Sequence, residues 1–329
     1  MRETTESSTS QGSSAPSRGI LVLAGPTAGG KSALGMEIAR RVGGEIVCAD
    51  SMQIYRGLDI GTAKPISAER AEIRHALLDV ADPYGDGFTV ADWLRLANEA
   101  VLEAHTRGKL PILVGGTNLY LRAFFEGLDT APAADMKFRA TLERESDESL
   151  RALLQAVDPI RASELHLHDR RRTIRALEVH HLTGKPMSSM ATQWDVASPR
   201  MMRDRTRLVI LDWPVELINR RINARVKSML EAGFLREVES LHAQGQLGRQ
   251  AAEAVGYREL GAVLSGELRL DAAFESIKIR TRQYAKQQRV WLRRFASIEG
   301  VLRIDANVTD PSAWADLVLA QWPDLTTTA

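Results

Sequence analysis

The stretch Gly25-Pro26-Thr27-Ala28-Gly29-Gly30-Lys31-Ser32 decides the fold of this chain. An apolar run, residues 20–24, precedes it, and an amphipathic run, residues 33–41, follows it. A strand, a glycine-rich turn and a helix start are the context that a phosphate-binding P-loop requires. The backbone N–H groups and the helix N-terminus favour an anion, Lys31 adds a full charge, and the Ser32 hydroxyl can bind Mg²⁺. By motif the loop predicts a nucleotide such as ATP, but alone it leaves open which phosphate compound binds.

The composition is typical of a soluble globular protein. The chain has 329 residues, 44% hydrophobic and 26% charged, with a net charge of +1, so a nucleic-acid partner would need local basic clusters. The single cysteine, Cys48, excludes an intrachain disulfide and favours a cytoplasmic location. No apolar run approaches the ~20 residues that span a bilayer. Residues 1–18 are rich in Ser, Thr and Gly, and we expect a disordered tail there.

Alternating strand and helix patterns predict an α/β fold, a P-loop NTPase-like parallel sheet flanked by helices. The expected strands are residues 20–24, 45–49, 75–80, 110–114, 208–212 and 301–304. The expected helices of the core are residues 32–41, 88–106, 119–125, 215–231, 234–242, 251–264 and 271–295. Residues 51–65 are polar and glycine-punctuated, and we expect a loop with one short helix there.

A helical insertion interrupts this pattern. Residues 135–190 are charged and poor in strand signal, with helices expected at residues 137–144, 149–156 and 170–183. An α/β chain that turns helical and then returns to strand predicts an inserted subdomain. We therefore divide the chain into a tail (1–18), a P-loop core with a helical C-terminal part (19–130 and 200–310) and a helical insertion domain (131–199).

Polar residues follow several of the expected strands. Asp50 follows residues 45–49, at the carboxyl end where open α/β sheets place their chemistry. Its carboxylate can hold Mg²⁺ through water or act as a general base, and the alternative is an ordinary loop or capping aspartate. Thr117 follows Gly115-Gly116 and can point at the same pocket, although such glycine pairs are often plain turns. Asp79 and Asp212 also end apolar runs, and neither is decisive as a Walker-B aspartate.

The chain has two basic clusters. Residues 278–294 contain seven Lys or Arg and no acid. Five of these cations recur at helical spacing and share one face, namely Lys278, Arg282, Lys286, Arg289 and Arg293. Such a stripe can neutralise the phosphates of a nucleic acid, and a solvated basic face is the alternative. Its lack of interleaved acids favours a polyanion partner.

The second cluster, Asp169-Arg170-Arg171-Arg172-Thr173, begins a helix of the insertion. Four histidines lie near it, His166, His168, His180 and His181. With no cysteines or paired acids beside them, we expect surface or packing histidines and no metal site.

Together these blocks resemble the tRNA dimethylallyltransferase family, also called tRNA isopentenyltransferases, in its bacterial form. The resemblance runs from Leu21 to about Arg294 and rests on six segments in order: GPTAGGKS, ADSMQIYRGLDIGTAKP, LVGGTNLYLRAFFEGL, DRRRTIRALEV, AVGYRE and TRQYAKQQRVWLR. It departs from the usual loop in Gly29 and Ser32. Ala254 stands where some relatives have cysteine, and no zinc finger follows the core.

The resemblance implies a reaction and its partners. The family transfers a dimethylallyl group from dimethylallyl diphosphate to the exocyclic amine of the tRNA adenine just 3′ of the anticodon. The insertion would then close over the anticodon arm, Mg²⁺ would be the cofactor with Ser32 as ligand, and a monomer is expected. The main alternative is a P-loop small-molecule kinase. A non-catalytic GTPase-like RNA-binding module is a third reading, but its Asn-Lys-x-Asp signature is absent.

The resemblance also assigns residues. The catalytic set is Asp50, Thr117 and Lys31. The diphosphate would contact Gly25, Pro26, Thr27, Ala28, Gly29, Gly30, Lys31, Ser32 and Arg258. The tRNA would contact Asp50, Ser51, Met52, Gln53, Thr117, Arg139, Asp169, Arg170, Arg171, Arg172, Thr173, Glu253, Ala254, Val255, Gly256, Tyr257, Arg258, Thr281, Arg282, Gln283, Tyr284, Ala285, Lys286, Gln287 and Gln288.

Overall fold

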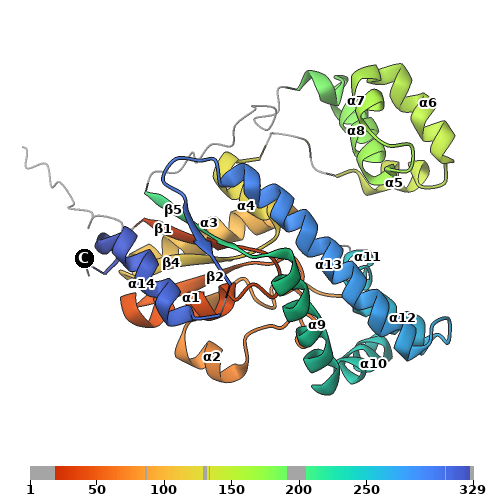
Figure 1. The fold of residues 1–329 in the computed structure, drawn as a ribbon. Coiled ribbons are helices and arrows are strands. Elements are labelled where there is room, and N and C mark those ends of the chain that lie inside the picture. Colours follow the sequence, from red (N-terminus) through yellow and green to blue (C-terminus); the bar gives the residue numbers. More distant parts are fainter. Residues whose placement is uncertain are drawn as a thin grey trace, which may run out of the picture. The chain divides into compact units, whose positions relative to one another are not determined.

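The structure is a computed structural model that describes residues 19–85, 87–128, 132, 134–190, 205–307 and 309–326 (Figure 1). The chain forms two compact units, one of Met1–Phe125 with Met201–Ala329 and one of Glu126–Arg200. The tail expected at residues 1–18 lies outside the described residues. Within the described ranges, every helix is too short or too polar to span a lipid bilayer.

A six-stranded parallel sheet forms the centre of the first unit, with the order β3-β2-β4-β1-β5-β6. Its strands are β1 (Ile20–Ala24), β2 (Gly44–Ala49), β3 (His75–Ala76), β4 (Leu110–Gly115), β5 (Thr206–Asp212) and β6 (Leu302–Asp305). The predicted parallel α/β sheet is therefore confirmed. The strand expected at residues 75–80 is wrong beyond Ala76, because Leu77 and Asp79 have φ values of 66° and 59°, which no strand adopts.

Helices cover both faces of the sheet. Successive residues of β1 alternate between the faces: Leu21 and Leu23 join one buried cluster, and Val22 and Ala24 join the other. The first cluster includes side chains of α1 (Lys31–Val42) and α14 (Pro311–Gln321). The second includes side chains of α3 (Val90–Thr106), α4 (Asn118–Glu126) and the last turns of α13 (Leu270–Phe295). These layers hold the carboxyl ends of the strands in place.

The remaining helices of this unit are α2 (Ser67–Glu72), α9 (Val215–Glu231), α10 (Phe234–Gln244), α11 (Arg249–Ala252) and α12 (Tyr257–Leu264). The single helix expected at residues 251–264 is wrong: the chain breaks between α11 and α12, where Gly256 has a φ of 95°. The short helix expected within residues 51–65 is also wrong, since that segment forms turns and α2 begins only at Ser67.

The second unit is helical throughout its described residues. Its elements are α5 (Met136–Leu142), α6 (Asp147–Val157), α7 (Pro159–Glu164), α8 (Arg170–Thr183) and a 3₁₀ turn, Met187–Ser189. Helices α5 to α8 share a small core of their own that includes Leu150, Leu154 and Leu177. The sequence pattern missed α7, a short helix that Asp158 caps by accepting from the backbone N–H of Arg161.

Candidate functional site

Three segments meet at the carboxyl edge of the sheet. Ala24 of β1 pairs with Gly115 of β4, and Gly115 pairs with Ala49 of β2. The next residues along these strands, among them Gly25 and Asp50, therefore lie at the same edge. A side chain at position 115 is excluded, because its Cβ would lie 2.1 Å from the Ala49 carbonyl oxygen. The sheet thus brings together the P-loop, Asp50 and the turn that carries Thr117.

The P-loop carbonyls bond to side chains outside the loop. Arg221 Nε donates to the Ala28 carbonyl at 2.8 Å, and Trp213 Nε1 donates to the Gly29 carbonyl at 3.0 Å. A trans peptide places its carbonyl and the following N–H on opposite sides. The N–H of Gly30 therefore points away from Trp213. Together with the unpaired first N–H groups of α1, it forms the donor set that an anion requires.

Three cations surround this loop. Lys31 Nζ donates to the Pro26 carbonyl at 2.8 Å, and Arg225 Nη2 donates to the Thr62 carbonyl at 3.2 Å. Burial lowers the pKa of Lys31 to about 8, against the charge of Asp50, which raises it. Burial likewise lowers the pKa of Arg225, which Asp50 raises and Arg221 lowers further. Lys31 and Arg225 both interact with the Asp50 carboxylate, and together with Arg221 at the loop they create a site that a polyanion would stabilise.

Arg221 and Arg225 were missed by the sequence reasoning. Both lie on α9, four residues apart and therefore on one face. The available signal was this spacing on the helix that follows β5. That signal is weak, because helical arginines at such spacing are common on solvated surfaces.

Asp50 is held by its own backbone turn. Its Oδ1 accepts from the N–H of Met52 at 2.9 Å and of Gln53 at 3.4 Å. Nearby, Thr117 Oγ1 accepts from the Ser51 N–H at 3.0 Å. The Tyr284 hydroxyl interacts with Thr117, and burial raises its pKa, so the phenol stays neutral. These contacts fix the carboxylate next to the cationic loop.

Gln288 connects the P-loop to the turn after β4. Its Oε1 accepts from the Thr27 N–H at 2.8 Å, and its Nε2 donates to the Gly116 carbonyl at 2.8 Å. Gln288 is 2% exposed and its side chain makes these internal bonds, and the tRNA contact expected for Gln288 stays a prediction. The side chains of Thr173, Ala254, Tyr257 and Ala285 are buried as well, and the tRNA contacts expected for these residues also stay predictions.

A carboxylate organises the loop between Asp50 and α2. Glu237 of α10 accepts from the N–H groups of Asp59, Ile60 and Gly61 at 3.1, 2.6 and 3.2 Å. The Tyr257 hydroxyl donates to the same carboxylate at 2.6 Å. No sequence pattern points to Glu237, because one glutamate on an amphipathic helix is unremarkable until its partners are known.

Some cations of the basic stripe on α13 have partners close by. Lys278 pairs with Glu275 at 2.7 Å, and Arg282 Nη1 donates to Asn223 at 3.3 Å. Lys286 and Arg293 remain exposed on the same face, and Arg289 is half-buried. The cations of α13 that remain available to a polyanion therefore lie in the C-terminal half of the helix. Ile277, on the same helix, is buried at 3% exposed.

Several cations expected at tRNA or diphosphate have protein partners instead. Arg258 pairs with Glu253 at 3.2 Å and is 59% exposed, so nothing in the structure brings it to the P-loop. In the second unit, Arg139 bonds the buried Glu178 through two nitrogens, at 2.7 and 2.8 Å. Arg170 pairs with Asp147 at 2.5 Å. Asp169 caps α8, while Arg171 and Arg172 are exposed at its start.

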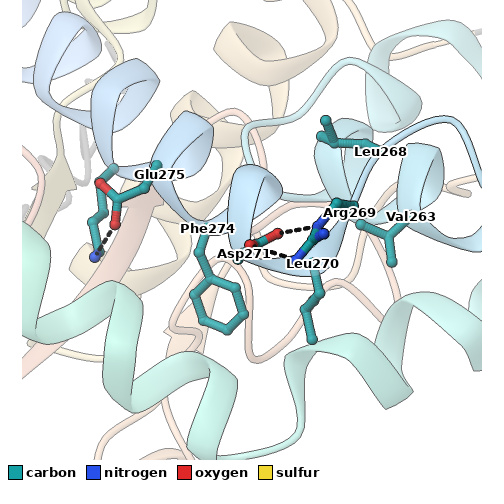
Figure 2. A pocket seen from close by; sticks show the side chains of 8 residues that line it. Val263, Leu268, Arg269, Leu270, Asp271, Phe274 and Glu275 are labelled. Carbon is teal, nitrogen blue, oxygen red and sulfur yellow. Dashed lines mark hydrogen bonds and ion pairs between the residues drawn. The ribbon is translucent and has the colours of Figure 1, made fainter.

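A separate hollow lies elsewhere. Figure 2 shows it at the turn between α12 and α13, an open hollow of about 860 Å³. Its charges pair with each other: Arg269 with Asp271 at 3.1 Å, and Glu275 with Lys278 at 2.7 Å. No unpaired charge is left there to orient a substrate.

Among the described residues no group of three His, Cys, Asp or Glu could hold a metal ion. A metal at the P-loop would therefore depend largely on the oxygens of its substrate.

Comparisons with known proteins identify relatives of this chain. Residues 53–295 match the model of the IPP transferase family. The tRNA dimethylallyltransferase of Geobacter metallireducens is 45% identical over 286 residues, 85% of this chain and 91% of that protein. The one of Halorhodospira halophila is 44% identical over 280 residues, 83% of this chain and 89% of that protein.

Solved structures extend the likeness to the fold. The full-length tRNA isopentenylpyrophosphate transferase of Bacillus halodurans superposes with a TM-score of 0.66 at 32% identity, covering 94% of this chain and 98% of that one. A eukaryotic dimethylallyltransferase acting on tRNA gives 0.75 at 29% identity, covering 92% and 77%. On its sequence and its fold, the chain belongs to the IPP transferase family.

Proposed function

We propose that the chain transfers a dimethylallyl group from dimethylallyl diphosphate to the exocyclic N6 amine of the adenine 3′-adjacent to the anticodon in tRNA, releasing diphosphate. One observation carries the proposal: the Gly30 N–H and the first N–H groups of α1, with Lys31, Arg221 and Arg225 around them, adjoin a fixed carboxylate, Asp50. The family relatives named as tRNA dimethylallyltransferases support it. A tRNA substrate favours the cytoplasm as the location.

The first half of the reaction releases diphosphate. The bond between the allylic carbon and the diphosphate oxygen breaks, and its electron pair leaves with the diphosphate. Charge that develops on the leaving group is stabilised by donors already in place, namely the Gly30 N–H, the first N–H groups of α1 and the three cations. Because these groups are held by protein contacts, little reorganisation is needed at that moment.

In the second half, the adenine amine attacks the allylic carbon. The nitrogen lone pair forms the new C–N bond, and an N6 proton passes to the Asp50 carboxylate. The adenine amine is a poor nucleophile because its lone pair is delocalised into the ring, so proton removal as the bond forms lowers the barrier. To reach the site the base must leave its stack, as in other base-modifying enzymes.

Mg²⁺ is part of the proposal as cofactor. The Ser32 hydroxyl, in the first turn of α1, is an oxygen ligand of the kind that Mg²⁺ prefers, and substrate phosphates usually complete its coordination. The ion would supply additional charge neutralisation on the diphosphate. We further propose that the enzyme acts as a monomer and that the exposed cations of α13 contact the tRNA backbone.

The test is an alkylation assay with an unmodified tRNA, dimethylallyl diphosphate and Mg²⁺, read by mass spectrometry of the nucleosides. The wild-type chain should alkylate one adenine. Asp50→Asn should reduce turnover by at least ~100-fold, the usual size of a lost general base, while tRNA binding is retained. Asp212→Asn is the control, since Asp212 also ends a strand but pairs with Arg303 at 2.6 Å. Phosphoryl transfer from ATP without alkylation would instead establish a kinase.

A further inference from the structure

The C-terminal segment contacts the P-loop from outside. It lies beyond residue 295, where the match to the family model ends. A Cβ on Gly30 would come within 2.9 Å of the Trp314 ring, so this ring packs directly against the loop. Helix α14 is fastened to α1 because Arg41 pairs with Asp316 at 2.5 Å. Position 30 therefore requires glycine for two reasons. There is no room for a side chain beside Trp314, and the backbone φ of 89° favours glycine.

Trp213 connects Trp314 to the loop. The two indole rings meet edge to face, with centroids 6.1 Å apart and an interplanar angle of 86°. Trp213 is 3% exposed, and its Nε1 donates to the Gly29 carbonyl. The Arg221 guanidinium lies over this indole, 4.7 Å from the ring centroid. Arg221 also bonds Thr309 of the C-terminal segment. The indole of Trp213 thus has little freedom to move.

We propose that Trp213, supported by Trp314, is a positioning residue for the diphosphate. It acts through the Gly29–Gly30 peptide: with the carbonyl of Gly29 bonded to the indole, the N–H of Gly30 is directed to the opposite side, toward the leaving group. Without that bond the peptide can rotate, and the Gly30 donor is lost in part of the population. This inference rests on the proposed function, because it specifies how that site holds its diphosphate.

The test compares Trp213→Phe with Trp322→Phe. Phenylalanine keeps a ring but removes the N–H donor. Trp322 belongs to the same C-terminal segment and takes part in neither the ring pair nor the guanidinium stack, so its variant controls for general perturbation. For Trp213→Phe we expect the KM for dimethylallyl diphosphate and the Kd for inorganic pyrophosphate to rise about tenfold, as when one buried acceptor loses its donor. The kcat for alkylation should fall as well, because the Gly30 N–H also stabilises the charge that develops on the leaving group, while the KM for tRNA should stay within about twofold of wild type.

Trp314→Leu is the second variant, since it removes the ring support and leaves the indole donor of Trp213 in place. It should shift the same two constants in the same direction by a smaller factor. Unchanged diphosphate constants in a folded Trp213→Phe, or equal effects of Trp213→Phe and Trp322→Phe, would overturn the inference. If Trp213→Phe does not fold, unchanged constants in Trp314→Leu overturn it. Failure of the wild-type chain to bind either diphosphate would instead remove the proposed function itself.

Discussion

Gln288 accepts a hydrogen bond from the backbone N–H of Thr27 at 2.8 Å, although the two residues are 261 positions apart in the chain. The other end of the same amide bonds the Gly116 carbonyl. One buried side chain on α13 therefore fixes the spacing between the P-loop and the turn that carries Thr117. That spacing sets where the leaving group lies relative to Asp50.

Replacing Gln288 should cost both stability and catalysis. Gln288→Ala leaves a buried N–H and a buried carbonyl without partners, so we expect a loss of about 1–3 kcal/mol in the free energy of unfolding. The kcat for alkylation should fall as well, because the two halves of the site are no longer joined. Urea unfolding and steady-state kinetics measure the two effects. Gln287→Ala, at the exposed neighbouring position, is the control and should change neither.

The charge of Lys31 should make diphosphate binding depend on pH. Its pKa is lowered to about 8, and only the protonated amine attracts the anion. Affinity for dimethylallyl diphosphate is therefore greatest below pH 8 and falls as the pH rises through that value. Isothermal titration calorimetry between pH 6.5 and 9.5 measures this fall, which appears as a bend in the plot of log affinity against pH. A Lys31→Arg variant that still binds should lack the bend, since arginine stays charged. A flat wild-type profile would contradict this assignment.

Lys286 should act on tRNA alone. We expect Lys286→Ala to weaken tRNA binding and to reduce the slope of log K against log salt by about 0.7–0.9 for one lost phosphate contact. Its affinity for dimethylallyl diphosphate should be unchanged. The matched variant is Lys278→Ala, on the same helix face but paired with Glu275, and it should lower the slope less. If the wild type, Lys286→Ala and Lys278→Ala have equal salt slopes, α13 does not contact the RNA.

Glu237 should determine the stability of the loop at residues 59–61. In Glu237→Gln one of the two carboxylate oxygens becomes an NH₂ group, so two of the four groups that now donate to the carboxylate, the three N–H groups and the Tyr257 hydroxyl, meet a donor in place of an acceptor. We expect a loss of about 1.5–3 kcal/mol in the free energy of unfolding, as for hydrogen bonds to a charged group. Glu239→Gln, an exposed glutamate on the same helix, should be neutral. Thermal and urea unfolding decide between these outcomes.

Local patterns were sufficient to predict the strands that meet at the site, because the apolar runs before Gly25, Asp50 and Gly116 are long and end in polar residues. Parallel pairing then brings their ends together without further information. The side chains from other elements that contact this edge of the sheet could not be predicted in this way. Arg225 and Gln288 reach it from helices far along the chain, and nothing in their local sequence encodes the tertiary contact.

The same limit applies to the predictions on α13 and α12. Spacing alone shows which cations share a helix face, but it does not show the acids on neighbouring turns and helices. Glu275, which pairs with Lys278, is one such acid. Tyr257 looked able to contact RNA because its segment matched a family block. Its burial is set by the packing of α10 against α12, where its ring meets Phe234 edge to face at 5.0 Å.

The strand order has a consequence for the growing chain on the ribosome. Central strand β1 lies between β4, which precedes the helical unit at residues 126–200, and β5, which follows it. During synthesis β1 can gain its first neighbour early, but its second edge stays unpaired until the helical unit has been made. Arg225 and Gln288 emerge later still. A nascent chain thus exposes an open strand edge for a long interval, and it has no complete diphosphate cradle until α13 has been synthesised.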